Sequence, residues 1–267
     1  MLTTSPSVYR YFIELAFNGT IFHGWQIQPG DITVQETLNH AIGMLTGEAV
    51  NLVGCGRTDS GVHASHFVAH FDVQQPINDC INLTAKLNRF LNKPIRIYRI
   101  VNVDPDAHAR FDACSRTYKY LISKNKTPFA SDFSWNLCIP LDIDAMNKAC
   151  SFIVGKHDFT SFSKLHTDVK TNNCEVFEAS WSEKSGMLVF TIRSDRFLRN
   201  MVRAIVGTLI EVGKGKIQIE DVGRIMDEKD RSKAGMSVPA HGLFLAKVEY
   251  NPGIFDVEPK DPFSDWF

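Results

Sequence analysis

The stretch Gly54–Ala64, which reads GCGRTDSGVHA, places one carboxylate between glycines. Its aspartate, Asp59, follows Arg57 by two residues, so both side chains point the same way if the segment is extended. A guanidinium stays charged and keeps a partly buried carboxylate ionised. An ionised carboxylate on a fixed loop suits covalent or base catalysis at a sugar carbon. The alternative is a turn aspartate that bonds to its own backbone, a common arrangement among glycines.

Other site chemistries fit this stretch less well. Its glycines match neither the phosphate-binding loop nor the G-x-G-x-x-G dinucleotide pattern, and Ser60 lacks the G-x-S-x-G context of a nucleophile elbow. Three histidines, His63, His66 and His70, are close enough to raise a metal site. On a strand, however, His66 and His70 share a face with Val68 between them. We therefore favour a polar sheet face for these histidines and expect no metal.

A second group of charges lies in residues 195–212. The spacing of the apolar residues predicts one long helix with a buried stripe on one side. The opposite arc has no acidic residue after Asp195 and carries three arginines, Arg196, Arg199 and Arg203. Forked guanidinium donors on one face suit a polyanion. Because the whole chain has a net charge of −1, we expect a shaped RNA-binding surface rather than binding by bulk charge.

Helices and strands must both contribute to positioning these groups. A helix is predicted after the capping box that begins at Thr33, with Val34, Leu38 and Ile42 on its apolar stripe and a stop at Gly47. Further helices are predicted at 83–92, 142–155, 195–212 and 220–226. Strands are predicted at 9–17, 65–73, 95–103, 116–122, 174–183, 187–194 and 243–250. Strands interleaved with helices and hairpins favour an α+β fold with a mainly antiparallel sheet.

The composition is that of a soluble globular protein. The chain has 267 residues, of which 44% are hydrophobic and 22% charged, enough to build a substantial core. Six cysteines occur without a C-x-x-C pair, which argues against a zinc site or a disulfide framework. No apolar run is long enough for a membrane helix, and the first residues lack the pattern of a signal peptide. We therefore expect a cytoplasmic protein.

Several segments together resemble one family. GCGRTDSGVHA resembles the G-A-G-R-T-D-A-G-V-H-A signature of the tRNA pseudouridine synthase A family, with Cys55 and Ser60 where the family usually has alanine. Both replacements are small and should leave the loop backbone intact. Further segments resemble family segments in the same order: FHGWQ at 22–26, HARF at 108–111 with RTYKY at 116–120, GKHDFTSF at 155–162, FLRNMVR at 197–203 and GLFL at 242–245. The likeness covers nearly the whole chain.

The resemblance implies an enzyme that isomerises uridine to pseudouridine at positions 38, 39 and 40 of the tRNA anticodon stem-loop. The target base would be flipped out of the RNA, and neither a metal nor a cofactor would be used. The implied fold is two α+β lobes that form a mainly antiparallel sheet flanked by helices, with an active cleft between them. The lobes would span 1–105 and 106–250, followed by a tail at 251–267. The family works as a homodimer.

By position, the resemblance makes Asp59 the catalytic aspartate. Tyr118 would stack on the target uracil, Arg203 would be the basic partner of Asp59, and Arg57 would guide the flipped nucleotide. The remaining candidates for substrate contact are Arg110, Arg196, Arg199 and Leu245. Two rival functions follow from the same residues. A non-catalytic RNA-binding module would not need Asp59, and a metal-dependent hydrolase would use His63, His66 and His70.

Overall fold

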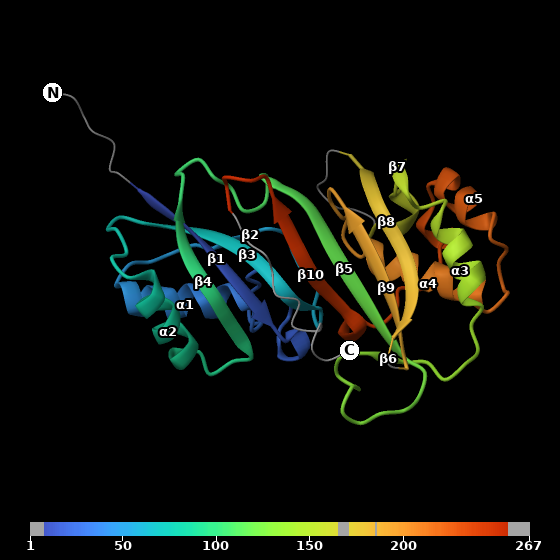
Figure 1. Cartoon of the computed structure of the whole chain (residues 1–267), viewed down its shortest axis with the longest axis horizontal. Coiled ribbons are helices and arrows are strands. Elements are labelled where there is room, and N and C mark those ends of the chain that lie inside the picture. The colour runs from blue at the N-terminus through green and yellow to red at the C-terminus, as the bar shows by residue number, and fades with distance from the viewer. Residues whose placement is uncertain (1–7, 165–170, 185, 256–267) are drawn as a thin grey trace. The chain divides into compact units, whose positions relative to one another are not determined.

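The structure is a computed structural model that describes residues 8–164, 171–184 and 186–255. Within them the chain divides into two compact units. Unit 1 contains residues 8–114 and 245–255, and unit 2 contains residues 115–244. Each unit is an assembly of strands and helices, labelled in Figure 1. No helix of the described residues is both long enough and apolar enough to cross a bilayer.

Unit 1 is built on a sheet in the order β4-β1-β3-β10, with the short β2 added to β3. β1 is antiparallel to both β3 and β4, and β2 is antiparallel to β3. Helix α2 packs beside β4 and α1. The elements are β1 (Tyr9–Phe17), α1 (Val34–Thr46), β2 (Val53–Gly54), β3 (His63–Val73), α2 (Cys80–Phe90), β4 (Ile95–Val103) and β10 (Leu243–Tyr250).

The local signals at α1 are confirmed. The Thr33 side chain accepts a hydrogen bond from the Glu36 N–H at 3.3 Å, which caps the first turn. Gly47 ends the helix with a φ of 76°, a left-handed conformation that glycine adopts without strain. Val34, Leu38 and Ile42 are buried, as the apolar stripe predicts.

The histidines of β3 do not face solvent; they are buried acceptors of backbone hydrogen bonds. Nδ1 of His63 accepts from the Gly19 N–H at 3.0 Å, Nδ1 of His66 from Val248 at 3.0 Å, and Nδ1 of His70 from Ala109 at 3.1 Å. All three rings are at most 4% exposed. The polar face favoured above is therefore a buried one, and each ring satisfies an N–H from a distant segment.

His70 gives the fold a dependence on pH. Burial, with the charges of Arg10 and His108, lowers the pKa of His70 to about 4. An unfolded histidine has a pKa of about 6.5, so between these values the unfolded chain binds a proton that the folded chain excludes. Stability is therefore lost as the pH falls through this window. We expect this group alone to lower the free energy of unfolding by about 3 kcal/mol.

The measurement is urea unfolding near pH 7 and near pH 4.5 for the wild type and His70→Asn. Asparagine Oδ1 can replace Nδ1 as the acceptor for the Ala109 N–H, but it does not titrate. We expect the variant to lose less stability on acidification than the wild type. Equal losses in the two proteins would show that His70 is not the group responsible.

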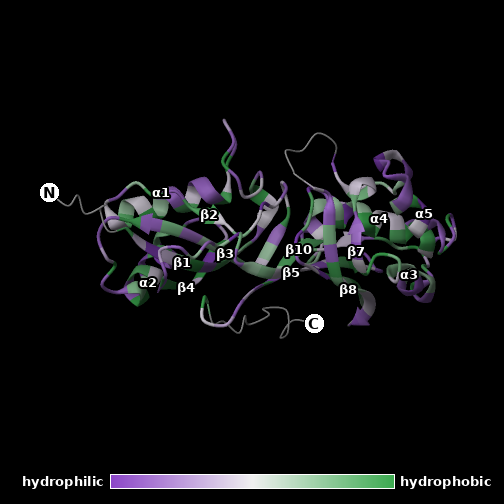
Figure 2. Cartoon of the chain, turned by 90° about the horizontal axis from the view of Figure 1, so that it is seen from above, coloured by the Kyte–Doolittle hydropathy of each residue, from purple (hydrophilic) through white to green (hydrophobic). Residues whose placement is uncertain are grey.

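Unit 2 is built on a second set of antiparallel strands, in the order β5-β9-β8-β7. The short β6 pairs with β5 in the parallel direction. Helix α3 packs on α4 and β8. Figure 2, coloured by hydropathy, shows both hydrophilic and hydrophobic residues along β8, of which Cys174, Val176 and Trp181 are buried. The elements are β5 (Ala113–Ser123), β6 (Trp135–Asn136), α3 (Ile143–Cys150), β7 (Gly155–Asp158), β8 (Asn173–Lys184), β9 (Met187–Ser194), α4 (Met201–Gly213) and α5 (Asp221–Glu228).

These units confirm the α+β class with a mainly antiparallel sheet. The predicted bounds of β1, β4 and β10 match the observed strands residue for residue. The predicted cap of α3 is also present, since the Asp142 carboxylate accepts from the Ala145 N–H at 2.8 Å. The compact units group residues 106–114 and 245–250 with unit 1, whereas the predicted lobes place both segments in the second lobe. The hairpin predicted at 184–186 lies partly outside the described residues, and so does most of the tail.

The predicted helix over 195–212 is wrong in its first six residues, because α4 begins at Met201. The Asp195 carboxylate accepts from the N–H groups of Glu175 and Arg196, and the Ser194 hydroxyl donates to the Arg196 carbonyl. Asn200 then takes a left-handed φ of 68° immediately before the helix. These bonds hold residues 195–200 as a loop, so the three arginines do not share one helical arc.

Candidate active site

Asp59 lies on a loop of residues 55–62, called here the Asp59 loop, which joins β2 to β3. The Cys55 N–H donates to the Val68 carbonyl of β3 at 2.8 Å. At the other end the Val62 N–H donates to the Asp59 carbonyl at 3.1 Å, closing a turn in which Gly61 has a φ of 77°. Asp59 is half-buried, whereas Arg57 is exposed. The loop therefore reverses the direction of the chain and leads into β3, which runs antiparallel to β2.

A second segment, residues 18–25, holds the Asp59 loop from the other side. The Trp25 N–H donates to the Thr58 carbonyl at 3.3 Å, and the Gly61 N–H donates to the Phe22 carbonyl at 3.3 Å. Backbone bonds thus tie the chain to the 18–25 segment just before and just after Asp59. A carboxylate held in this way is preorganised, since its backbone needs no reordering to act.

Two glycines permit this close packing. Gly24 has a φ of 86°, and a Cβ there would lie 2.3 Å from the Thr58 carbonyl oxygen. A Cβ at Gly54 would lie 2.7 Å from the Trp25 ring. That ring stacks on Phe67 of β3, with centroids 4.2 Å apart. Any larger side chain at either position would push the 18–25 segment or its tryptophan away from the Asp59 loop.

Unit 2 carries the aromatic candidate. Tyr118 lies on β5 opposite Ile192 of β9 and is half-buried. The ring of Phe197 meets it edge to face, with centroids 5.0 Å apart and planes at 83°. An edge-to-face partner fixes the ring orientation of Tyr118 while leaving a face of the ring for another planar group. The sequence did not reveal Phe197 as a partner of Tyr118, because its spacing suggested the buried stripe of a helix.

Arg203 lies in the first turn of α4 and is held by the segment 234–239. Its Nε donates to the Val238 carbonyl at 2.7 Å, and the Val238 N–H donates back to the Arg203 carbonyl at 3.2 Å. The same segment is anchored by Arg231, which donates to the carbonyl of Gly235 and to the hydroxyl of Ser237. The guanidinium of Arg203 is therefore oriented by the protein before any ligand arrives.

A buried tyrosine supports this arrangement from β5. The hydroxyl of Tyr120 donates to the Pro239 carbonyl at 2.9 Å. Burial raises the pKa of Tyr120 far above its ordinary value, with a smaller opposite effect from Arg203. Tyr120 thus stays a neutral donor and ties the 234–239 segment to β5.

Two more candidate arginines of unit 2, Arg196 and Arg199, lie on the loop before α4. The Arg116 guanidinium donates to the Asp195 carbonyl at 2.8 Å. Arg196 is half-buried, and Arg199 is exposed with its carbonyl accepting from the Lys164 N–H. The structure therefore brings Arg196 and Arg199 together on a loop that Arg116 braces, and places only Arg203 on the helix.

The candidates fall into two groups by compact unit. Unit 1 holds Asp59 and Arg57 together on one loop. It also holds Arg110, which is exposed beside Phe111, and Leu245, which is 1% exposed within β10. Tyr118, Arg203, Arg196 and Arg199 belong to unit 2.

Within residues 8–164, 171–184 and 186–255 no cluster of three or more His, Cys, Asp or Glu could hold a metal ion. Nδ1 of each β3 histidine already accepts a hydrogen bond from a backbone N–H.

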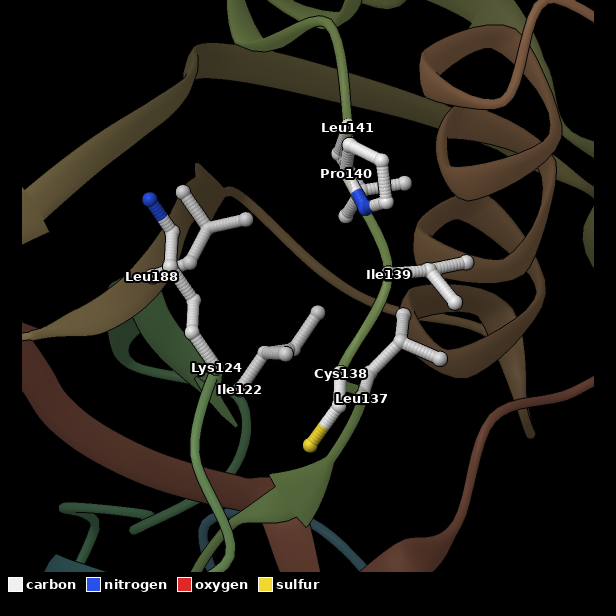
Figure 3. A pocket seen from close by; sticks show the side chains of 8 residues that line it. All are labelled: Ile122, Lys124, Leu137, Cys138, Ile139, Pro140, Leu141 and Leu188. Carbon is white, nitrogen blue, oxygen red and sulfur yellow. The ribbon is translucent and has the colours of Figure 1, made fainter.

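Unit 2 also contains a pocket of about 340 Å³, shown in Figure 3, whose lining is mostly apolar and includes Lys124 as its one charged residue. None of the residues that line this pocket carries a carboxylate or an imidazole, and Lys124 pairs with Glu183.

Comparison with known proteins gives a consistent result. A family model described as tRNA pseudouridine synthase matches residues 149–251. The tRNA pseudouridine synthase A of Parabacteroides distasonis is 55% identical over 249 residues, covering 93% of this chain and 99% of the relative. The proteins of the same name from Bacteroides fragilis and a Thermoanaerobacter species are 51% and 39% identical, over 94% and 89% of this chain and 100% and 98% of their own lengths. The chain therefore belongs to the tRNA pseudouridine synthase A family of isomerases.

Proposed function

We propose that this enzyme isomerises uridine to pseudouridine at positions 38, 39 and 40 of the tRNA anticodon stem-loop, with Asp59 as the catalytic carboxylate. The observation that carries the proposal is the half-buried Asp59, whose loop is tied by backbone bonds to the 18–25 segment on both sides. The family supports the reaction class, and the arrangement of this loop supports the assignment of Asp59. The enzyme would act in the cytoplasm as a homodimer of two-lobed subunits.

The reaction needs one carboxylate and no redox change. The N1–C1′ glycosidic bond breaks, the uracil turns, and C5 bonds to C1′ while the C5 proton leaves and N1 gains a proton. The Asp59 carboxylate can attack C1′ and form an ester that the returning uracil displaces, or it can remove a ribose proton to give a glycal. Either route requires Asp59 to be ionised and held beside the ribose.

The other candidates would bind and turn the base. A stacked uridine cannot be reached, so it must be flipped out at a cost of a few kcal/mol. Stacking on Tyr118 would return about 1–3 kcal/mol of this cost. We propose that Arg203 balances the charge of Asp59, that Arg57 guides the flipped nucleotide, and that Leu245 contacts the substrate. Arg110, Arg196 and Arg199 would contact phosphates, which makes binding depend on salt.

The test of the proposed function is tritium release from tRNA that carries 5-tritiated uridine. We expect one tritium released for each uridine at positions 38, 39 and 40, and none from a matched tRNA with cytidine at those positions. Equal release from both tRNAs would assign the activity to other uridines, and no release from either would contradict the reaction.

The packing at Gly24 predicts a specific loss of turnover. Gly24→Ala places a Cβ against the Thr58 carbonyl and displaces the Asp59 loop. We expect kcat for tritium release to fall by about 10- to 100-fold, because small displacements of a catalytic group are costly. Gly30→Ala is the matched control, since Gly30 has a φ of 81° but nothing within 4 Å of the added Cβ. Both variants lose stability from backbone strain; similar kcat values per folded molecule would contradict the packing argument.

A further inference from the structure

We infer that His63 is a positioning residue for Asp59, acting through the 18–25 segment. His63 is the first residue of β3, directly after the Asp59 loop, and its side chain is 1% exposed. Its Nδ1 accepts a hydrogen bond from the Gly19 N–H at 3.0 Å. The inference rests on the proposed function, because it concerns the placement of the catalytic carboxylate.

The bond closes a short ring of contacts around the loop. Gly19 begins the turn that leads to Phe22, whose N–H donates to the Gly19 carbonyl at 2.9 Å. The Phe22 carbonyl in turn accepts from the Gly61 N–H, two residues before His63. His63 therefore joins the start of the 18–25 segment to the end of the Asp59 loop. Phe22 joins the same two segments three residues after Gly19.

Close backbone contact makes this ring sensitive to displacement. A Cβ at Gly19 would lie 2.1 Å from the Val62 carbonyl oxygen, so the two backbones already touch. Gly19, Phe22 and Val62 are all buried. A shift of the 18–25 segment at Gly19 must therefore displace residues 61 and 62 as well. Because the Val62 N–H donates to the Asp59 carbonyl, that displacement also reaches Asp59.

The imidazole supplies an acceptor that few side chains can replace. Because Nδ1 accepts the Gly19 N–H, it carries no proton in this arrangement. Removing the ring leaves a buried N–H without this acceptor, and such groups move to find another partner. Asparagine can place Oδ1 where Nδ1 lies, whereas leucine fills similar space without an acceptor.

The chain offers a matched control on the same strand. His70 makes the same kind of bond, from Nδ1 to the Ala109 N–H at 3.1 Å, and is also buried. It lies seven residues further along β3, roughly 23 Å at the usual rise of a strand. Losing the His70 bond should lower stability as much as losing the His63 bond, but the N–H that it leaves without this acceptor belongs to Ala109, outside both the 18–25 segment and the Asp59 loop.

The experiment compares His63→Leu, His63→Asn and His70→Leu in the tritium-release assay, with kcat corrected for the folded fraction. We expect His63→Leu to lower kcat by about 10- to 100-fold while KM stays within about threefold. His63→Asn should recover most of the loss, and His70→Leu should lower the melting temperature but keep kcat within about twofold. An unchanged kcat in His63→Leu, no recovery in His63→Asn, or an equal loss in His70→Leu would overturn the inference.

Two further measurements keep the result decisive. If His63→Leu does not fold, the ¹⁵N spectrum of wild-type His63 tests the bond directly: protonated Nε2 with an unprotonated Nδ1 is expected, and a proton on Nδ1 would overturn the inference. Asp59→Asn in the same assay separates the two claims. An active Asp59→Asn removes the proposed role of Asp59, whereas an inactive Asp59→Asn with a fully active His63→Leu removes only the positioning role of His63.

Discussion

Asp59→Asn should abolish turnover, with kcat for tritium release reduced on the order of 10⁴-fold or more. The amide has nearly the shape of the carboxylate, but it is neither charged nor basic, so it can neither attack C1′ nor remove a ribose proton. The loop should keep its shape, because backbone bonds at residues 58, 59, 61 and 62 help to hold it, and the amide keeps the size and one acceptor oxygen of the carboxylate. The loss is therefore expected in chemistry and not in folding.

The measurement pairs tritium release with tRNA affinity. We expect the dissociation constant for tRNA to stay within a few-fold, because phosphate contacts supply most of the affinity. Asp31→Asn is the control for removing one negative charge nearby, since Asp31 lies close to His23 in the neighbouring segment. Substantial turnover by Asp59→Asn would rule out the catalytic role and favour an RNA-binding module that does not need this residue.

Tyr118→Ala should give the second largest loss, with kcat/KM reduced by about 100-fold. The ring is half-buried on β5 and held edge to face by Phe197, so it is already oriented for stacking. Removing it takes away the stacking energy that offsets base flipping. Tyr118→Phe keeps the ring and should lose no more than about fivefold.

The comparison of the two Tyr118 variants decides what the residue does. Steady-state tritium release for each variant gives kcat and KM separately. Phe197→Leu provides a further check, because it removes the edge-to-face contact but leaves Tyr118 in place, and it should fall between the two. Equal losses in Tyr118→Phe and Tyr118→Ala would show that the hydroxyl matters and that stacking is not the whole role.

The parts of the fold that local rules govern could be predicted from the sequence. Helix α1 follows from the Thr33 cap, the apolar stripe and Gly47, all of which act within a few residues. The strand bounds of β4 and β10 follow from β-branched and aromatic runs. The α+β class follows from the order of these elements.

The start of α4 could not be predicted, because a non-local interaction decides it. The Asp195 carboxylate bonds to the Glu175 N–H, 20 residues away on β8, and this bond competes with helix formation. The helical period of 195–212 was present in the sequence, but it could not reveal this partner. As a result the predicted arc of three arginines is replaced by a loop with Arg196 and Arg199 and a helix with Arg203.

Only the part of the candidate site that depends on neighbouring residues could be predicted from the sequence. Asp59 could be selected from its motif, since the glycines and arginine lie within a few residues of it. The contacts of its supporting segment could not be predicted, because the Gly19 N–H and the His63 ring are 44 residues apart. The acceptor roles of His66 and His70 on β3 could not be predicted for the same reason, because they depend on the N–H groups of the distant residues Val248 and Ala109.

The most direct test maps pseudouridine in the anticodon arm by mass spectrometry after incubation of unmodified tRNA with wild-type enzyme and with Asp59→Asn in parallel. The result expected is pseudouridine at positions 38, 39 and 40 with the wild type and unmodified uridine there with the variant. Pseudouridine formed equally by both proteins, or formed by the wild type only outside the anticodon arm, would contradict the assignment of Asp59 or of the substrate.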